Sequence, residues 1–275
     1  MVVQLEQITH KTDHMKFAIS GPERDQYTQA VRDLLDGELP SGWEWVDSSA
    51  NSIVARRSKP NQVYFKEFLR RTPFEGIKSF FRGSRCQRAI IKGEKLRQKG
   101  FYCPVVYCWG KRGNRHFMIS EGIDALGLGD HINECWQQPL TGAAILTKRR
   151  LLNKFGEEIG KLHRNGICHG DLRVNNILVQ KSGDDFVFYF LDNERNAFFS
   201  EIPERLIRKN LVQLNMMQSP HVSRQDRLRF FQAYCQAYGG VDPAKKLALL
   251  RGVQQTTAER LAKKAEKKRV GQSNT

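Results

Sequence analysis

The chain has 275 residues, enough for one large domain or for two lobes that each bury a core. Its 45 Lys and Arg against 29 Asp and Glu give a formal net charge of +16 at pH 7. This charge indicates an anionic partner such as a nucleotide, a phosphosugar, a lipid headgroup or nucleic acid. The six cysteines form no CxxC pair, so we expect reduced thiols in a cytosolic chain and no zinc site. The longest purely apolar run, residues 186–191, is far too short to span a bilayer, and the first residues lack the layout of a signal peptide. We therefore expect a soluble or peripherally attached protein.

The first 121 residues are predicted to form a small lobe made of a sheet and one helix. The stretch up to about residue 47 is polar and mixed, and it ends in an alternation, SGWEWVDSS, that is typical of an edge strand. Two more strands are predicted at NSIVARR and QVYFKEFL, and two at PVVYCW and RHFMISE around the glycine turn KRGN. Between these pairs, residues 84–99 place apolar side chains at helical spacing and end before a glycine.

Residues 122–255 are predicted to form a second, mainly helical lobe that carries the catalytic motifs. GIDALGLGD is interpreted as a linker, and helices are expected in TKRRLLNKFGEEIGKLHRNG, PERLIRKNLVQLNMM and SRQDRLRFFQAYCQAYGG. Two apolar runs around the turn KSGDD predict a hairpin between the first and second of these helices. Residues 256–275 are charged and poor in large apolar side chains, so we expect a basic, flexible tail. The predicted fold class is α+β.

Polar motifs lie at both ends of the predicted hairpin. The segment HGDLRVNN places His169, Asp171 and Asn176 on a loop before a strand, in the H-x-D-x-x-x-x-N spacing of a kinase catalytic loop. In such loops the aspartate orients the attacking hydroxyl or accepts its proton, and the asparagine holds magnesium. Asp192 follows the second strand, where a kinase site requires a second oxygen ligand for the metal. For His169 we expect a hydrogen-bonding role that supports the loop.

Lys66 lies among apolar residues in the predicted strand QVYFKEF. Its place before the catalytic loop is that of the strand lysine that binds nucleotide phosphates in kinases and pairs with a glutamate on the next helix. Glu94 is the candidate on that helix, but Glu67 and Glu75 are also near in sequence, and the choice among them stays open.

Two departures from protein kinases narrow the substrate. The loop before Lys66 has no GxGxxG, so phosphates would be covered by Ser and Asn side chains and backbone N–H groups. Gly170 stands where regulated protein kinases carry an arginine, and Asp-Asn-Glu replaces Asp-Phe-Gly. The glycine at position 170 and the Asp-Asn-Glu sequence argue for a small-molecule kinase that is not gated by phosphorylation.

Together these segments resemble the lipopolysaccharide kinase family, the Kdo and heptose kinases within the protein-kinase-like superfamily. The resemblance covers roughly residues 50–235 and is carried by YFKEF, GSRCQRAIIKGEKLRQKGF, FMISEGI, HGDLRVNNIL, YFLDNER and RLIRKNLVQLN. It implies a two-lobed kinase fold that uses ATP and Mg²⁺. By the same resemblance Asp171 is the catalytic base, Asn176 and Asp192 bind the metal, and Lys66 binds the phosphates together with Glu94.

The resemblance also implies a location and a substrate. Glu121 and Ile123, in FMISEGI, would contact adenine. The acceptor would be a sugar hydroxyl, on Kdo or heptose, of the lipopolysaccharide inner core at the inner face of the bacterial inner membrane. The net positive charge fits such an anionic glycolipid and peripheral contact with an anionic membrane. We expect no nucleic-acid partner.

Two other functions remain as alternatives. A small-molecule kinase of the aminoglycoside-phosphotransferase type uses a similar H-G-D loop, although that class binds cationic substrates in an acidic pocket and this chain is basic. A pseudokinase or nucleic-acid-binding module would explain the missing glycine loop and the basic tail, but all four polar catalytic positions are retained.

Overall fold

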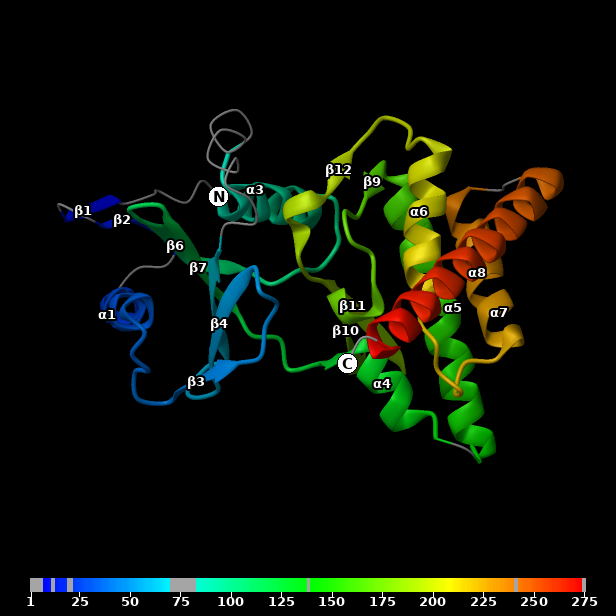
Figure 1. Ribbon diagram of the computed structural model, residues 1–275, viewed down its shortest axis with the longest axis horizontal. Helices are drawn as coiled ribbons and strands as arrows, with labels where there is room; N and C mark the ends of the chain where they lie inside the picture. Colours follow the sequence, from blue (N-terminus) through cyan, green and yellow to red (C-terminus); the bar gives the residue numbers. More distant parts are fainter. Residues whose placement is uncertain are drawn as a thin grey trace. The chain divides into compact units, whose positions relative to one another are not determined.

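The computed structural model describes residues 7–10, 13–18, 22–69, 83–137, 139–239 and 242–273. The chain divides into two units (Figure 1). The first unit comprises Met1–Arg97 and Cys103–Asp124, and the second comprises Gln98–Tyr102 and Ala125–Thr275. The division thus follows Asp124, three residues after the position expected from the sequence. Among the described residues, no helix combines the length and the apolar character that crossing a bilayer requires.

The first unit is built on a seven-stranded antiparallel sheet with the order β1-β2-β6-β7-β5-β4-β3. Its strands are β1 (Gln7–His10), β2 (Asp13–Phe17), β3 (Trp43–Val46), β4 (Ser52–Arg57), β5 (Val63–Phe68), β6 (Val106–Arg112) and β7 (Arg115–Glu121). The five strands predicted from the sequence are confirmed. So is the position of β3 at an edge of the sheet.

The helix α1 (Pro22–Asp36) lies in a segment where the sequence analysis expects no helix. The helix carries apolar residues at helical spacing, namely Tyr27, Val31, Leu34 and Leu35. They are fully buried in one core with side chains from one face of the sheet, such as Phe65. Burying each such side chain contributes roughly 1.5–3 kcal/mol, which stabilises the helix despite its polar remainder.

The predicted helix of residues 84–99 is confirmed as α3 (Arg85–Gln98). It lies on the opposite face of the sheet from α1, because side chains alternate along β5. Phe65 belongs to the core with α1, whereas the Phe68 ring lies 5.1 Å from the guanidinium carbon of Arg85 on α3. Lys66 is therefore on the α3 face.

The second unit is mainly helical (Figure 1). Its helices are α4 (Leu128–Cys135), α5 (Gly142–Arg164), α6 (Glu204–Asn215), α7 (Arg224–Tyr238) and α8 (Pro243–Ser273). The unit also contains two short 3₁₀ turns, η1 (Val174–Asn176) and η2 (Asn193–Arg195). Its strands are β8 (Leu126–Gly127), β9 (Ile167–Cys168), β10 (Ile177–Ser182), β11 (Asp185–Phe190) and β12 (Ala197–Phe198). The three predicted helices and the predicted hairpin are confirmed as α5, α6, α7 and β10–β11.

The structure corrects the sequence analysis at the start of this unit and adds detail at its end. The predicted linker GIDALGLGD contains β8 and the first residues of α4, because Leu128 and Ile132 are buried one turn apart. At the other end, α8 continues as a helix through Ser273, across the segment expected to be flexible. Its buried Leu249, Val253 and Thr257 anchor it, and the Asn215 amide on α6 donates a hydrogen bond to the Thr257 hydroxyl (3.0 Å).

Close packing of α5 on α7 brings buried polar groups into contact. A Cβ atom on Gly160 of α5 would lie 2.6 Å from the carbonyl oxygen of Tyr234 on α7, so only glycine allows the two backbones to approach this closely. One turn later, the imidazole Nδ1 of His163 lies 3.0 Å from the Tyr234 hydroxyl. The close approach at Gly160 thus brings His163, six residues before His169, into contact with Tyr234.

Candidate active site

The candidate catalytic residues lie on two facing arcs of the second unit, residues 169–176 and 191–196. Two antiparallel pairings close these arcs at opposite ends: β9 with β12, which sets Cys168 opposite Ala197, and β10 with β11, which sets Ile177 opposite Phe190. At the hairpin end, the Leu191 N–H also donates to the Asn176 carbonyl oxygen (2.9 Å). Residues that lie far apart in sequence, such as Cys168 and Ala197, therefore meet through backbone pairing.

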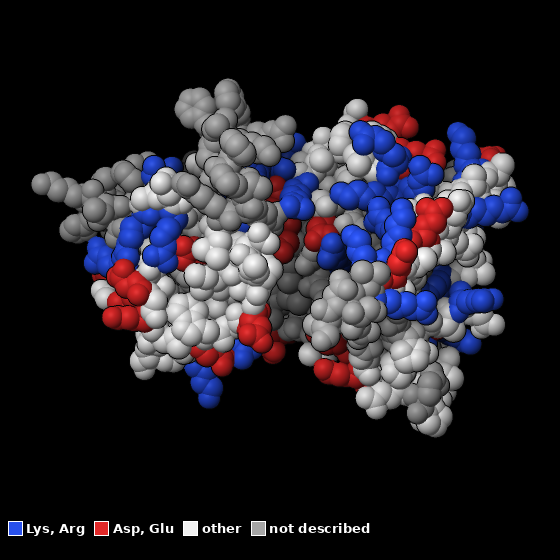
Figure 2. Space-filling model, viewed as in Figure 1, with Lys and Arg blue, Asp and Glu red and all other residues white. Residues whose placement is uncertain are grey.

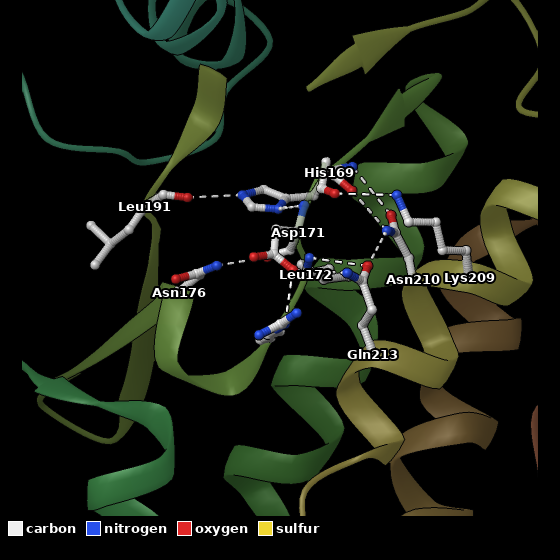
Figure 3. Close-up of polar contacts among 10 residues, drawn as sticks. His169, Asp171, Leu172, Asn176, Leu191, Lys209, Asn210 and Gln213 are labelled. Atoms are coloured by element: carbon white, nitrogen blue, oxygen red, sulfur yellow. Dashed lines mark hydrogen bonds and ion pairs between the residues drawn. The ribbon is translucent and has the colours of Figure 1, made fainter. Parts of the chain in front are cut away.

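His169 is fully buried and holds both arcs together (Figure 3). Its Nδ1 accepts a hydrogen bond from the Asp171 N–H (3.1 Å), so its Nε2 carries the proton and donates to the Leu191 carbonyl oxygen (2.9 Å). Burial lowers the pKa of His169 to about 4, although the bond to Leu191 opposes the shift. A neutral imidazole with both nitrogens occupied supports the loop, as expected, and does not act as the base.

Asp171 occupies the centre of the first arc, with its side chain 30% exposed. One carboxylate oxygen, Oδ1, accepts from the Gln213 amide (2.9 Å) and lies 2.9 Å from Nε of Arg173. The backbone carbonyl of Asp171 accepts from the Asn176 amide nitrogen (2.8 Å). Figure 3 shows Asp171 between Asn176 and Gln213. A carboxylate held in one rotamer and open to solvent can orient a hydroxyl group of a substrate.

Asn176 and Asp192 supply the oxygen atoms that could hold a metal ion. The hairpin base places them on adjacent strand ends, because the Asn176 carbonyl is bonded to the residue directly before Asp192. Since the Asn176 amide nitrogen faces the Asp171 carbonyl, the side-chain oxygen points the other way. No cluster of three or more His, Cys, Asp and Glu side chains with metal-binding geometry occurs among the residues that the structure describes. Two oxygen ligands nevertheless fit Mg²⁺, which commonly takes one or two protein ligands and completes its shell with water and substrate phosphates.

The backbone of Asp192 adopts a left-handed conformation, with φ 53° and ψ 47°. It is the one non-glycine residue with positive φ in the described part of the chain. Such a conformation costs free energy for most residues, although Asp and Asn adopt it more readily. Strained backbone of this kind concentrates at functional sites, where the surrounding structure holds a side chain in a required direction.

Gly170 has a steric reason to be glycine. A Cβ atom at this position would lie 2.6 Å from the carbonyl carbon and oxygen of Arg195 and closer still to the Arg195 Cβ. The Gly170 N–H donates to the Asn196 side chain (3.2 Å), and its carbonyl accepts from Lys209 (3.2 Å). The second arc therefore leaves no room for a side chain at position 170.

In the first unit, Lys66 lies in the middle of β5, opposite Val54 on β4 and Met118 on β7. Its amine is 5.5 Å from the centre of the Phe68 ring, on the face of the sheet that carries α3. The lysine is half-buried. This strand position and this face are the ones expected for a phosphate-binding lysine.

The structure excludes one of the three glutamates considered as partners of Lys66. Glu67 points to the opposite face, where it is buried and forms two hydrogen bonds with Arg115 (2.6 and 2.8 Å). Glu94 lies on α3 as predicted and forms an ion pair with Arg97. Glu75 lies outside the described residues. Glu94 therefore remains the candidate among the described carboxylates.

The predicted adenine-binding segment follows directly from the end of β7. The backbone N–H of Glu121 donates to the Val105 carbonyl (2.8 Å), and its carboxylate accepts from the Val105 N–H (3.1 Å). The Gly122 N–H donates to the Gln62 carbonyl (2.8 Å). These bonds fix the backbone at Glu121 and Gly122, and adenine binding at this segment stays a prediction.

Sequence analysis missed three polar residues that hold the catalytic loop. Asn210, on α6, is fully buried; its side chain accepts from the His169 N–H (3.1 Å) and donates to the His169 carbonyl (2.7 Å). His163 contacts the same amide through Nε2 (3.2 Å), and Gln213 contacts Asp171. The available signal was a polar residue on the apolar face of α6, between the buried Ile207 and Leu214.

Comparison with known proteins relates part of the chain to a family. Residues 109–234, which include both arcs and α6, match the lipopolysaccharide kinase (Kdo/WaaP) family. The predicted resemblance to this family is therefore confirmed over that segment. A solved structure of WaaP in complex with acyl carrier protein superposes with a TM-score of 0.61 at 18% identity, covering 88% of this chain and 97% of that chain. The predicted protein-kinase-like α+β fold is thereby confirmed.

Curated relatives share shorter segments. A 3-deoxy-D-manno-octulosonic acid kinase of Pasteurella multocida is 33% identical over 85 residues, which are 31% of this chain and 34% of the relative. An EKC/KEOPS complex subunit of Schizosaccharomyces pombe is 31% identical over 98 residues, which are 36% of this chain and 38% of the relative. The alignments thus span little more than a third of these relatives.

Proposed function

We propose that this protein is a kinase of the lipopolysaccharide kinase (Kdo/WaaP) family, which transfers the γ-phosphoryl group of ATP to a sugar hydroxyl, on Kdo or heptose, of the lipopolysaccharide inner core. The observation that carries the proposal is the arrangement of Asp171, Asn176 and Asp192 on two arcs joined by His169. The match of residues 109–234 to the family model and the likeness to a Kdo kinase support the choice of acceptor.

Each residue has a role that follows from its chemistry. Asp171, solvent-accessible and acceptor-only when ionised, would receive the hydrogen bond of the attacking sugar hydroxyl and then its proton. Asn176 and Asp192 would hold Mg²⁺, which when bound neutralises charge on the ATP phosphates. Lys66 would bind the phosphates as a point charge, with Glu94 as its proposed partner. The backbone between Glu121 and Ile123 would bind adenine.

The charge distribution of the second unit supports an anionic acceptor. Figure 2 shows Lys and Arg side chains gathered over the region of α6 and α8. The basic residues of α6 include Arg205, Arg208 and Lys209, and those of α8 include Lys263 and Lys264. A glycolipid with phosphates and acidic sugars, or an anionic leaflet, gains on the order of 1 kcal/mol for each nearby basic side chain. We propose peripheral contact with the cytoplasmic face of the inner membrane on this basis.

The test is transfer of labelled phosphate from Mg-ATP to core-truncated lipopolysaccharides. Asp171→Ala and Asp192→Ala should each lower the rate at least about 10³-fold, because each removes a group needed in the transition state. Asp184→Ala is the matched control, since that carboxylate lies in the hairpin turn and is 97% exposed. Transfer to an aminoglycoside instead of a glycolipid would support the alternative kinase class. Binding of Mg-ATP without transfer to any acceptor would indicate a pseudokinase.

A further inference from the structure

Two amide side chains on α6 face the catalytic loop. Asn210 and Gln213 are three residues apart and so lie on the same face of the helix. Asn210 is fully buried and Gln213 is half-buried. The Asn210 amide nitrogen donates to Oε1 of Gln213 (3.1 Å), and Gln213 in turn contacts Asp171. The pair forms a continuous polar connection from the helix to the catalytic carboxylate (Figure 3).

Backbone groups fix which end of each amide points where. A backbone N–H can only donate and a carbonyl can only accept, so the bonds of Asn210 to the N–H and carbonyl of His169 assign its oxygen and nitrogen without ambiguity. In the same way the Leu172 N–H lies 3.3 Å from Oε1 of Gln213, which assigns that atom as an acceptor. The remaining end, Nε2, therefore faces Oδ1 of Asp171 at 2.9 Å as a donor.

The connection continues into the helical core. Because Oδ1 of Asn210 only accepts, Nε2 of His163 must donate to it (3.2 Å), and Nδ1 of His163 then accepts from the Tyr234 hydroxyl (3.0 Å). Tyr234 is fully buried on α7. Every polar atom along this path has a defined role, and such fully satisfied buried networks are rigid.

We propose that Gln213 is a positioning residue, which fixes the rotamer of the Asp171 carboxylate through a hydrogen bond that Asn210 and the Leu172 N–H hold in place. The inference rests on the proposed function in that Asp171 is the catalytic base. Asp171 has a second partner, Arg173, whose Nε lies 2.9 Å from Oδ1 of Asp171, but the Arg173 side chain is 67% exposed. Gln213 is held at three points and is the fixed partner of the two.

The sharpest variant is Gln213→Glu. Glutamate has nearly the same shape and keeps an oxygen acceptor for Leu172 and Asn210, but it replaces the donor to Asp171 with a second acceptor. Gln213→Met removes both functions at similar volume. Gln218→Glu and Gln218→Met make the same changes at an exposed site just beyond the end of α6 and serve as matched controls.

Phosphate transfer to core-truncated lipopolysaccharide should lose about 10- to 100-fold in kcat in both Gln213 variants, the value of one hydrogen bond to a charged group. KM for ATP should stay within about twofold, since Gln213 contacts neither Lys66 nor the metal ligands. A kcat within twofold of the wild type overturns the proposal. So does a parallel loss of kcat, ATP affinity and melting temperature, which a merely structural role would produce.

A second readout does not depend on the acceptor. Crystal structures of the wild type and of Gln213→Glu should show one rotamer of the Asp171 carboxylate in the wild type and a displaced or divided one in the variant. An unchanged single rotamer in the variant overturns the positioning role. If the wild-type enzyme transfers phosphate to none of the acceptors, the proposed function fails, whereas the rotamer comparison still decides the role of Gln213.

Discussion

Gly170→Ala tests the close approach of the two catalytic arcs. The added Cβ would lie 2.6 Å from the Arg195 carbonyl carbon and oxygen, whereas carbon atoms in contact are about 3.5–4.0 Å apart. Since the Arg195 Cβ would lie closer still, one arc must move by about 1.5 Å. The movement is opposed on both sides, because Asn196 binds the Gly170 N–H and Lys209 binds its carbonyl.

The cost follows from these contacts. Overpacking costs about 1–3 kcal/mol, and loss of one of the two hydrogen bonds adds about 1 kcal/mol. A total of about 2–4 kcal/mol should lower the melting temperature by roughly 5–15 °C in a protein of this size. A displacement of about 1 Å at the neighbouring Asp171 should also lower kcat roughly 100-fold.

The assay combines thermal unfolding with phosphate transfer, and Gly142→Ala is the control. Gly142 begins α5, and an added Cβ there meets no atom within 4 Å. Alanine should therefore leave activity unchanged and stabilise the helix by up to about 1 kcal/mol. If Gly170→Ala matched the control in both melting temperature and turnover, the close approach of the arcs would be refuted.

Three further substitutions probe separate parts of the account. Burial lowers the pKa of His163 from 6.5 to about 4. Between these two pH values the unfolded chain binds a proton at His163 that the folded chain does not bind, so the free energy of unfolding falls as the pH drops from about 6.5 to about 4. In His163→Gln, chemical denaturation at several pH values in this range should show that the free energy of unfolding depends less on pH, with a slope smaller by about 1.4 kcal/mol per pH unit. An unchanged slope would contradict the conclusion that His163 is neutral in the folded protein. Asn210→Leu removes the two hydrogen bonds to the His169 backbone and should lower the free energy of unfolding by about 2–5 kcal/mol in the same assay. The control is Asn133→Leu at an exposed position, which should lower it by less than about 0.5 kcal/mol. Lys66→Met should lower kcat/KM for ATP at least about 100-fold with little change in melting temperature, and Lys111→Met, an exposed strand control, should retain full turnover.

The catalytic arcs could be predicted because their information is local. Two apolar runs on either side of KSGDD define the hairpin, and a hairpin necessarily brings Asn176 next to the segment that contains Asp192. The positions of Lys66 and Glu94 on β5 and α3 followed from the same kind of pattern. In each case the residue's element and its neighbours in sequence were sufficient.

The supporting contacts could not be predicted in this way. Gln213 is 42 positions from Asp171 in sequence, and no short pattern relates the two. The helix α1 was missed for a different reason: one apolar stripe around Tyr27 and Val31 is surrounded by charged residues, so the segment as a whole is polar. Gly170 was interpreted as a missing arginine, and only the position of Arg195 shows that no side chain fits there.

The most direct test of the central claim is the position of transferred phosphate. The purified protein would be incubated with γ-labelled Mg-ATP and two lipopolysaccharides, one truncated after Kdo and one after heptose, beside the Asp171→Ala variant. Label on a sugar hydroxyl of either glycolipid, absent with Asp171→Ala, is the predicted result. Label transferred equally by wild type and variant, or found only as free phosphate, would contradict the assignment of Asp171 as the catalytic base of a lipopolysaccharide core kinase.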